Sequence, residues 1–206
     1  RDRSPSRGLG DVYKRQGDPA RRAGNEYLYD MLASKNAQTF KEKGVRKVVT
    51  HCPHCLNSLK NEYPEFGSQL EVIHHSELLQ KLIQDGKVIS KPSEEEKIVF
   101  HDSCYLGRHN GIYDAPRETL KTNSLKEIEQ SRETGTCCGA GGARFLLEEN
   151  TGTRMSHHRL DELMVNEPNT IAVSCPYCVL MLEDAVKAKN LNVKVRDIGE
   201  MVEKKN

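Results

Sequence analysis

Residues 170–178, TIAVSCPYC, decide the fold. The apolar and β-branched run at 170–174 predicts a short buried strand. Pro176 suits the first turn of a helix, where the missing N–H costs little, and we expect that helix to reach about Lys189. A strand that runs directly into a helix is typical of an α/β fold with parallel strands. Cys175 and Cys178 would then lie at the carboxyl end of a strand, the edge at which open α/β sheets bind ligands.

The same pattern occurs earlier in the chain. Residues 46–50, RKVVT, predict a strand that runs into Cys52-Pro53-His54-Cys55. A gapless offset of 123 residues superposes the two motifs, and it also places Val72 on Val195 and Glu77 on Glu200. Internal similarity of this kind indicates a duplicated unit. The sequence therefore predicts two pseudo-repeated lobes.

Further strands and helices alternate along the chain. Strands are expected at 70–74, 97–100 and 193–195, and a strand or extended segment at 124–130. Helices are expected at 26–43, 56–63, 115–121 and 145–164. This alternation predicts an α/β fold with mainly parallel sheets and with the cysteine motifs at the carboxyl ends of strands.

The domain organisation follows from the offset and from local composition. Residues 1–16 lack periodicity and are expected to be disordered or a foreign leader, and the charged, Pro-containing residues 86–97 are expected to be a linker. Residues 17–85 would form a partial first lobe and residues 98–206 a complete second lobe. The first is called partial because the offset places Cys137 and Cys138 on Lys14 and Arg15. We therefore expect the native protein to extend further at its N-terminus.

Composition excludes several classes of protein. The chain has 206 residues and a net charge of +1, so no basic field argues for nucleic acid. No stretch approaches the roughly 20 apolar residues of a membrane span, and no signal peptide is recognisable. We expect a cytoplasmic protein, or one at the cytoplasmic face of a membrane within a larger assembly.

The seven cysteines are the strongest functional signal. In a reducing compartment such residues are metal ligands or redox groups rather than disulfides. The second lobe holds five of them: Cys104, Cys137, Cys138, Cys175 and Cys178. Tetrahedral zinc needs four ligands, and two adjacent cysteines do not easily face one ion, so the set favours an iron–sulfur cluster. Gly139, Gly141 and Gly142 would let the backbone approach such a bulky inorganic core.

Several phrases resemble a known family. They are GDPARRAGNEY (17–27), CPHCLNSLKNEYP (52–64), HHSELL (74–79), HDSCYLGRHNGIYDAPR (101–117) and CCGAGGAR (137–144). Together with Cys175-Pro176-Tyr177-Cys178 they are similar to the cysteine-rich CCG domain of heterodisulfide reductase and of related (Fe–S)-binding oxidoreductases.

That resemblance implies a function. It makes Cys104, Cys137, Cys138, Cys175 and Cys178 the ligands of one [4Fe–4S] cluster, cubane or noncubane. Cys52 and Cys55 would belong to a second, incomplete site that holds zinc or another cluster. The chain would be the electron-transfer module of a larger oxidoreductase, between a flavoprotein-type donor, such as an electron-transfer flavoprotein, and a quinone or disulfide acceptor. Ferredoxin-type clusters are the other expected redox partners.

Two alternatives stay open from the residues alone. One is a zinc-stabilised binding domain without redox activity, and the other is a dithiol redox protein that uses a single Cys-x-x-Cys pair.

The histidines are open to two interpretations. His51 and His54 would either complete a zinc site with Cys52 and Cys55 or be polar residues at a strand end. His101, Arg108 and His109 would either tune the centre or contact a substrate or partner, or else be ordinary strand-end and loop residues. For His74 we expect a hydrogen-bonding role, because the offset places it on Asp197, and for His157 and His158 we expect exposure on a helix.

Overall fold

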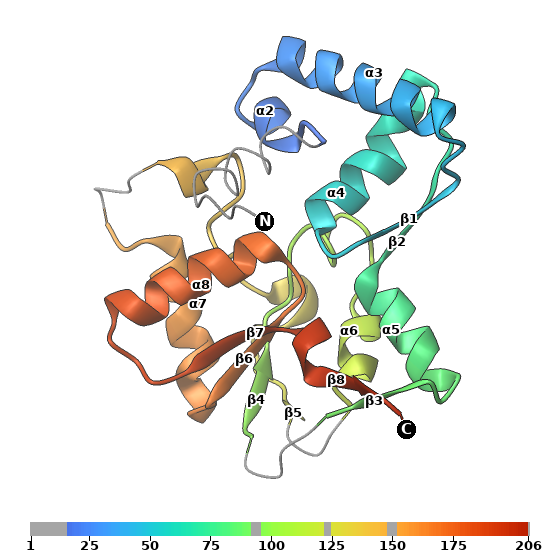
Figure 1. Cartoon of the computed structure of the whole chain (residues 1–206). Helices are drawn as coiled ribbons and strands as arrows, with labels where there is room; N and C mark the ends of the chain where they lie inside the picture. The colour runs from blue at the N-terminus through green and yellow to red at the C-terminus, as the bar shows by residue number, and fades with distance from the viewer. Residues whose placement is uncertain (1–15, 92–95, 122–124, 148–151, 206) are drawn as a thin grey trace, which may run out of the picture.

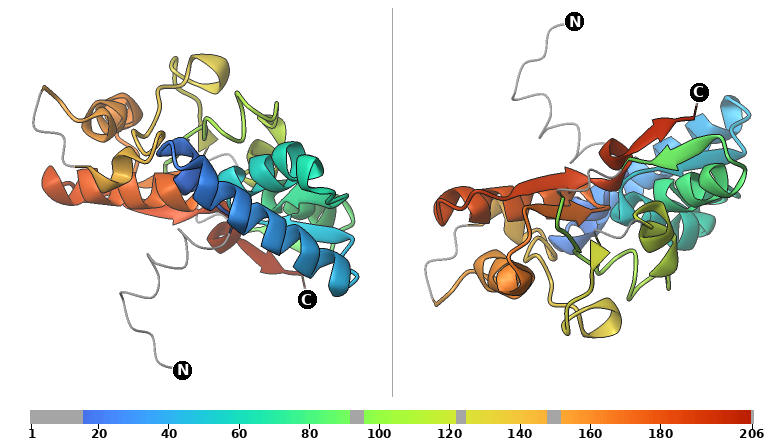
Figure 2. Two further views of the ribbon diagram at one scale, coloured as in Figure 1. Left: turned by 90° about the horizontal axis from the view of Figure 1, so that it is seen from above. Right: turned by 90° about the horizontal axis from the view of Figure 1, so that it is seen from below.

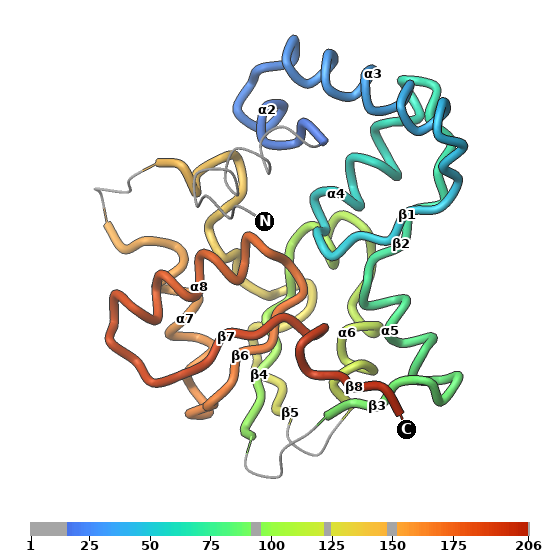
Figure 3. The backbone as a smooth tube through the Cα atoms, in the orientation of Figure 1, coloured from blue at the N-terminus to red at the C-terminus, as the bar shows by residue number. Residues whose placement is uncertain are grey.

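The computed structural model describes residues 16–91, 96–121, 125–147 and 152–205. The described part is an α/β fold whose helices surround short, mainly parallel sheets, as the sequence predicts (Figure 1). We refer to residues 16–91 as the first half and to residues 96–205 as the second half. The backbone trace shows the first half, blue to green, beside and above the sheet of the second half (Figure 3).

The second half is built on four parallel strands in the order β5-β4-β6-β7. Their bounds are β4 Ile98–Phe100, β5 Leu125–Lys126, β6 Thr170–Val173 and β7 Lys194–Asp197. The central strand β6 is buried along its whole length, as its apolar sequence requires. The helices α7 (Met155–Leu163) and α8 (Pro176–Ala188) pack on one face of this sheet, where Leu160, Leu182 and Ile171 share one apolar core.

The opposite face of the same sheet is covered partly by the first half. Phe100 and Ala172 pack there with Leu120, which caps the C-terminus of α6 (Asp114–Thr119), and with Ile198. Leu79 of α5 (His75–Gln84) packs against this core as well. Apolar contacts therefore join the two halves into one body.

The first half carries a smaller sheet in which β1 (Lys47–Thr50) pairs in parallel with β2 (Glu71–His74). Around it lie α2 (Asp18–Arg22), α3 (Glu26–Glu42) and α4 (Pro53–Asn57). The chain continues from α4 into a π-helical turn at Ser58–Glu62 and a 3₁₀ turn at Tyr63–Phe66. Tyr29, Leu56 and Tyr63 form the centre of this core. These elements place the first Cys-Pro-x-Cys motif beside the second half.

The predicted linker is partly wrong. Within residues 86–97, Val88–Ser90 forms strand β3, which pairs antiparallel with β8 (Val202–Lys204). The two strands lie side by side near the C-terminus (Figure 2). The β-branched Val88 and Ile89 favour extended structure, but their partner lies far along the chain, and no local pattern reveals it.

Two other expectations need correction. The helix predicted at 145–164 begins only at Met155, and a 3₁₀ turn occupies Arg144–Leu146. Gly152, with φ of 70°, has a left-handed backbone that interrupts a helix. Of the predicted leader, residues 1–15 lie outside the described residues, whereas Gln16 is buried and its carbonyl accepts a hydrogen bond from the Tyr63 hydroxyl at 3.0 Å.

None of the helices in the described ranges is long and apolar enough to cross a membrane.

Candidate metal centre

Each Cys-Pro-x-Cys motif begins a helix just after a parallel strand. Cys52 follows β1 and is the N-cap of α4, and Cys175 follows β6 and is the N-cap of α8. A proline is the first helical residue in both cases. Helix N-termini carry free N–H groups and a partial positive charge, which favour anionic sulfur at these positions.

The other three cysteines lie in loops of the second half. Cys104 lies in the turns that follow β4, and Cys137 and Cys138 lie between the short turns Arg132–Thr134 and Arg144–Leu146. The pair is separated from the nearest preceding strand, β5, which ends at Lys126.

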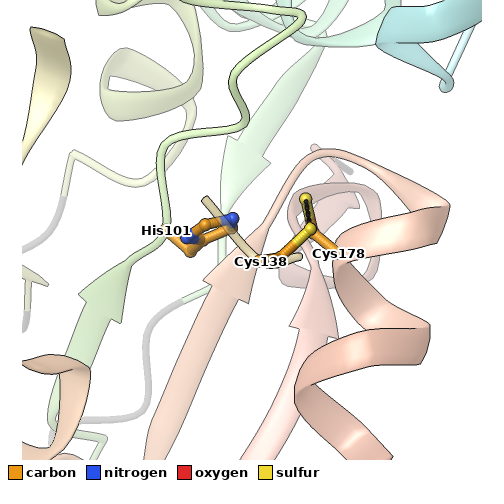
Figure 4. A group of neighbouring side chains, drawn as sticks. All are labelled: His101, Cys138 and Cys178. Atoms are coloured by element: carbon orange, nitrogen blue, oxygen red, sulfur yellow. Dashed lines mark hydrogen bonds between the residues drawn. The ribbon is translucent and has the colours of Figure 1, made fainter. Parts of the chain in front are cut away.

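The sulfur atoms nevertheless lie close together. The Sγ atoms of Cys138 and Cys178 are 3.4 Å apart, and the backbone N–H of Gly139 donates to Cys137 Sγ at 3.3 Å. A ring nitrogen of His101 and the sulfurs of Cys138 and Cys178 all lie within 4.8 Å of one another (Figure 4). All seven cysteines are free thiols.

The other thiols neighbour this set: Cys175 and Cys137 pack in the same cluster as Cys138 and Cys178, and Cys104 interacts with Cys137. The bond between Cys104 and Cys137 raises the pKa of Cys104 and lowers the pKa of Cys137. Burial acts to raise the pKa of Cys175, but the bond from Cys178 and the positive charge of His54 lower it to about 6. The five second-half cysteines therefore form one connected group of sulfur atoms.

The first-half pair lies against the same group. Cys52 belongs to the same buried cluster as Cys138, Cys175 and Cys178. The hydrogen bond with Cys55, burial and the negative charge of Cys175 all raise the pKa of Cys52. The structure thus brings all seven cysteines, from both halves, into one region.

His54 is held by groups other than the cysteines. Its Nδ1 lies 2.8 Å from Asp18 Oδ2, and its ring stacks on Tyr105 with centroids 3.9 Å apart. Burial acts to lower the pKa of His54, but the bond to Asp18 raises it overall. His51 is exposed at the end of β1. Zinc ligation by these two histidines remains a prediction.

His101 is completely enclosed beside the cysteines. It is 1% exposed, and its Nδ1 accepts a hydrogen bond of 3.0 Å from Nε of Arg159, itself fully buried. Burial and the charge of Arg159 lower the pKa of His101 to about 3. Of the three residues considered for tuning, His101 lies at the centre, whereas Arg108 and His109 are exposed.

Two ion pairs hold the segments that carry these groups. The Asp102 carboxylate accepts hydrogen bonds from both terminal nitrogens of Arg117, at 2.7 and 2.8 Å, and from the backbone N–H of Arg132 at 2.7 Å. On the other side of the Cys137–Cys138 loop, Glu162 accepts from Thr136 Oγ1 and from Arg159, both at 2.7 Å. These bonds fix the loop before the cysteine pair at both α6 and α7.

Gly139 is required by its surroundings. Its φ of 91° lies in the left-handed region, and a Cβ there would meet the Met155 Cβ at 3.1 Å. A Cβ on Gly141 would meet nothing within 4 Å. The close approach at Gly139 is therefore made to the start of α7.

The remaining histidines meet the expectations in part. His74 caps α5 by accepting from the Ser76 N–H at 3.3 Å, so its hydrogen-bonding role is confirmed. His158 is exposed as expected, whereas His157 is half-buried.

Sequence reasoning missed Asp18 and Arg159. Asp18 lies within the phrase 17–27 that carries the resemblance, and Arg159 lies outside all of the quoted phrases. In both cases only burial against a histidine distinguishes the residue from a surface charge.

Comparison with known proteins identifies the family. The model of the cysteine-rich domain named CCG matches residues 17–60 and 98–183, together more than half of the chain. The chain therefore belongs to the cysteine-rich CCG-domain family.

Three relatives show the range of similar proteins. The chain is 47% identical over 199 residues to the probable iron–sulfur-binding oxidoreductase FadF of Bacillus subtilis, with 94% of this chain and 28% of the relative covered. It is 46% identical over 199 residues to EtfAB:quinone oxidoreductase of Syntrophomonas wolfei, with 90% of this chain and 28% of the relative covered. It is 32% identical over 190 residues to a component of the dihydromethanophenazine:CoB–CoM heterodisulfide reductase of Methanosarcina barkeri, with 88% and 46% covered. The chain thus spans less than a third of the length of the first two relatives.

Proposed function

We propose that this chain is the iron–sulfur electron-transfer module of an oxidoreductase, and that Cys104, Cys137, Cys138, Cys175 and Cys178 hold a [4Fe–4S] cluster, cubane or noncubane. The observation that carries the proposal is the convergence of these thiols, with Cys138 and Cys178 in contact at 3.4 Å and both at most 3% exposed. Similarity to proteins named as iron–sulfur-binding and quinone oxidoreductases supports the same assignment.

The donor set fits such a cofactor. Soft thiolates select iron–sulfur clusters or zinc, and five thiols in one group exceed the four that a tetrahedral ion takes. Buried polar atoms without a partner among the described residues surround the group, including His101 Nε2 and the Tyr177 hydroxyl. Unpaired buried groups of this kind cost free energy and point to an acceptor or donor at the centre.

When bound, a cluster of this class accepts and donates single electrons. The chain holds the sulfur ligands in place from α8, from the turns after β4 and from the loop before α7. The Gly139 N–H and the N-terminus of α8 stabilise anionic sulfur, and burial keeps water away.

We propose that Cys52 and Cys55 form a second, incomplete site for zinc or another cluster. In this arrangement the first lobe is residues 17–85 and the second lobe is residues 98–206, with part of the intervening segment acting as the connection. The packing of Cys52 in the same buried cluster as Cys175 supports a second site next to the first.

The proposed repeat has support in the strand registers. Lys47 lies opposite Glu71 in the first half, and Thr170 lies opposite Lys194 in the second, so both pairs obey the offset of 123 residues seen in the sequence. The capping boxes of His74 with Glu77 and of Asp197 with Glu200 obey it as well.

For the whole protein we propose a flavoprotein-type electron donor, other iron–sulfur clusters of the ferredoxin type, and a quinone or disulfide acceptor, in the cytoplasm or at the cytoplasmic face of a membrane. The printed names of the relatives, which include an EtfAB:quinone oxidoreductase and a heterodisulfide reductase, support this set of partners.

The test is anaerobic purification, followed by iron, sulfide and zinc analysis and by EPR spectroscopy of the oxidised and reduced protein. We expect about four irons per chain. Cys138→Ser should lose them, and Val165→Ala, an exposed change just after α7, should keep them. Cys55→Ser should keep this iron and lose only metal of the second site. Zinc alone, with no iron after reconstitution, would refute the proposal and favour a zinc-stabilised binding domain.

A further inference from the structure

We infer that His101 donates a hydrogen bond from Nε2 to the sulfur centre without ligating the metal, and that Arg159 is the positioning residue that fixes the required tautomer. This inference rests on the proposed function for the nature of the acceptor. Neither residue is a cysteine, and together they link α7 to the end of β4.

The tautomer follows from the partner of Nδ1. A guanidinium group has only donors, and Nε of Arg159 lies 3.0 Å from His101 Nδ1. Nδ1 must therefore accept and carry no proton. The proton of the ring is then on Nε2.

That Nε2–H is buried and has no partner among the described residues. An unpaired donor in the interior is costly, so an acceptor is expected there. A ring nitrogen of His101 lies within 4.8 Å of the Cys138 and Cys178 sulfurs (Figure 4). Because Nδ1 is already taken by Arg159, we infer that the acceptor for Nε2 is at these sulfurs. A protonated Nε2 has no lone pair to offer a metal. The ring therefore faces the sulfurs as a donor.

Arg159 is held so that it cannot turn away. Its Nη1 donates to the Gln130 carbonyl at 2.9 Å and to Glu162 at 2.7 Å, and the side chain is fully buried. Its Nη2 has no partner among the described residues and adds to the positive charge near the cysteines. The same side chain thus orients His101 and supports the loop that leads to Cys137.

The expected consequence is a higher reduction potential. Hydrogen bonds to the sulfurs of a cluster, and positive charge nearby, stabilise the reduced state, which carries more negative charge. Removing the donor or its positioning residue should therefore lower the potential while the thiol ligands remain in place.

The experiment compares anaerobically prepared wild type with His101→Gln, His101→Leu, Arg159→Lys and Arg159→Met. Val165→Ala, at a position just after α7 that is 71% exposed, is the control. Iron content and the EPR-monitored reduction potential are measured on each sample.

We expect His101→Leu and Arg159→Met to lower the equilibrium constant for reduction about tenfold, which corresponds to a fall of ~59 mV in the reduction potential for one electron. Because Gln keeps an amide donor near the position of Nε2, His101→Gln should recover much of the shift. Arg159→Lys keeps the charge and loses the Nε donor, so it should fall between Arg159→Met and wild type.

Two results on iron-containing samples would overturn the inference. The first is an unchanged potential in His101→Leu and Arg159→Met variants that retain their iron, since a purely structural role predicts that. The second is a strong hyperfine coupling from nitrogen-15 histidine in the wild type, since this would make His101 a ligand; a donor gives only a weak coupling together with an exchangeable proton.

Absence of iron from the wild type would instead refute the proposed function. In that sample the long-range nitrogen–proton NMR spectrum of His101 tests the positioning role. We expect the proton on Nε2 in the wild type and a mixture of tautomers in Arg159→Met, and a proton on Nδ1 in the wild type would overturn the inference.

Discussion

Replacing Asp102 by Asn tests whether the ion pair beside His101 holds the second half together. The Asp102 carboxylate is 5% exposed and receives three hydrogen bonds, two from Arg117 and one from the Arg132 backbone. Asn removes the charge and at least one of these bonds, and it leaves the guanidinium, 9% exposed, without its buried counter-ion.

Breaking a buried pair by removing one partner costs about 3–5 kcal/mol. Glu127, which is half exposed, still pairs with Arg117 Nε at 2.6 Å, so the lower end of that range applies. About 3 kcal/mol corresponds to a fall in Tm of about 6–12 °C for a chain of this size. Thermal unfolding followed by circular dichroism under anaerobic conditions measures this change in Tm.

Asp114→Asn is the matched control. It makes the same chemical change to a carboxylate that pairs with Arg132 at 2.8 Å but is 76% exposed. Exposed pairs contribute about 0–1 kcal/mol, so Tm should fall by less than about 4 °C. Equal shifts in Asp102→Asn and Asp114→Asn would refute the assignment of a structural role to the buried pair.

The same pair predicts a pH dependence. Burial acts to raise the pKa of Asp102, but the bonds and charge of Arg117 hold it below its usual range. A lowered folded-state pKa means that the stabilisation is complete above the unfolded pKa of about 3.9 and is lost as pH falls through the folded value. The difference in Tm between wild type and Asp102→Asn should thus be constant above about pH 5 and shrink below about pH 4.

Two further predictions concern packing. Leu182→Ala, at a fully buried position of α8, should cost about 2–5 kcal/mol and lower Tm, whereas Leu180→Ala, at a position 44% exposed, should leave Tm nearly unchanged. Gly139→Ala should reduce the iron content and destabilise the fold by roughly 1–3 kcal/mol, because the backbone there is left-handed and the new Cβ meets Met155. Gly141→Ala has free space around the new Cβ and should keep the iron. Equal iron content in the two variants would contradict the close approach at Gly139.

The sequence predicted those elements whose pattern is local. The strand before Cys175 and the helix after it are visible because an apolar run meets a proline at a helix start. The same holds for the strand before Cys52 and for the helix that ends before Gly44. Each of these features lies within about one turn of helix or one strand.

Features that depend on distant partners were not predictable. β3 needs β8, more than a hundred residues away in the chain, and the charged, Pro-containing sequence around its short apolar run is typical of a linker. Arg159 and Asp18 resemble ordinary surface charges in the sequence, and only the fold shows that each meets a buried histidine. Composition and spacing carry no information on such single long-range contacts.

The meeting of all seven cysteines has a geometric explanation in the proposed repeat. The offset pairs Cys52 with Cys175 and His74 with Asp197, and all four residues lie at the carboxyl ends of parallel strands or just beyond them. In the folded chain these positions meet: Cys52 and Cys175 pack in one buried cluster, and His75, next to His74, bonds Asp197 at 2.9 Å. The carboxyl edges of the two parallel strand pairs therefore face one another. Because parallel strands bring the segments that follow them to a single edge, two such edges placed in opposition bring together the two Cys-Pro-x-Cys motifs and the turns that carry Cys104. The longer loop with Cys137 and Cys138 reaches the same place through its bonds to α7. A metal centre at that contact would depend on both halves, so loosening the interface at His75 and Asp197 should weaken metal retention even though neither residue is a cysteine.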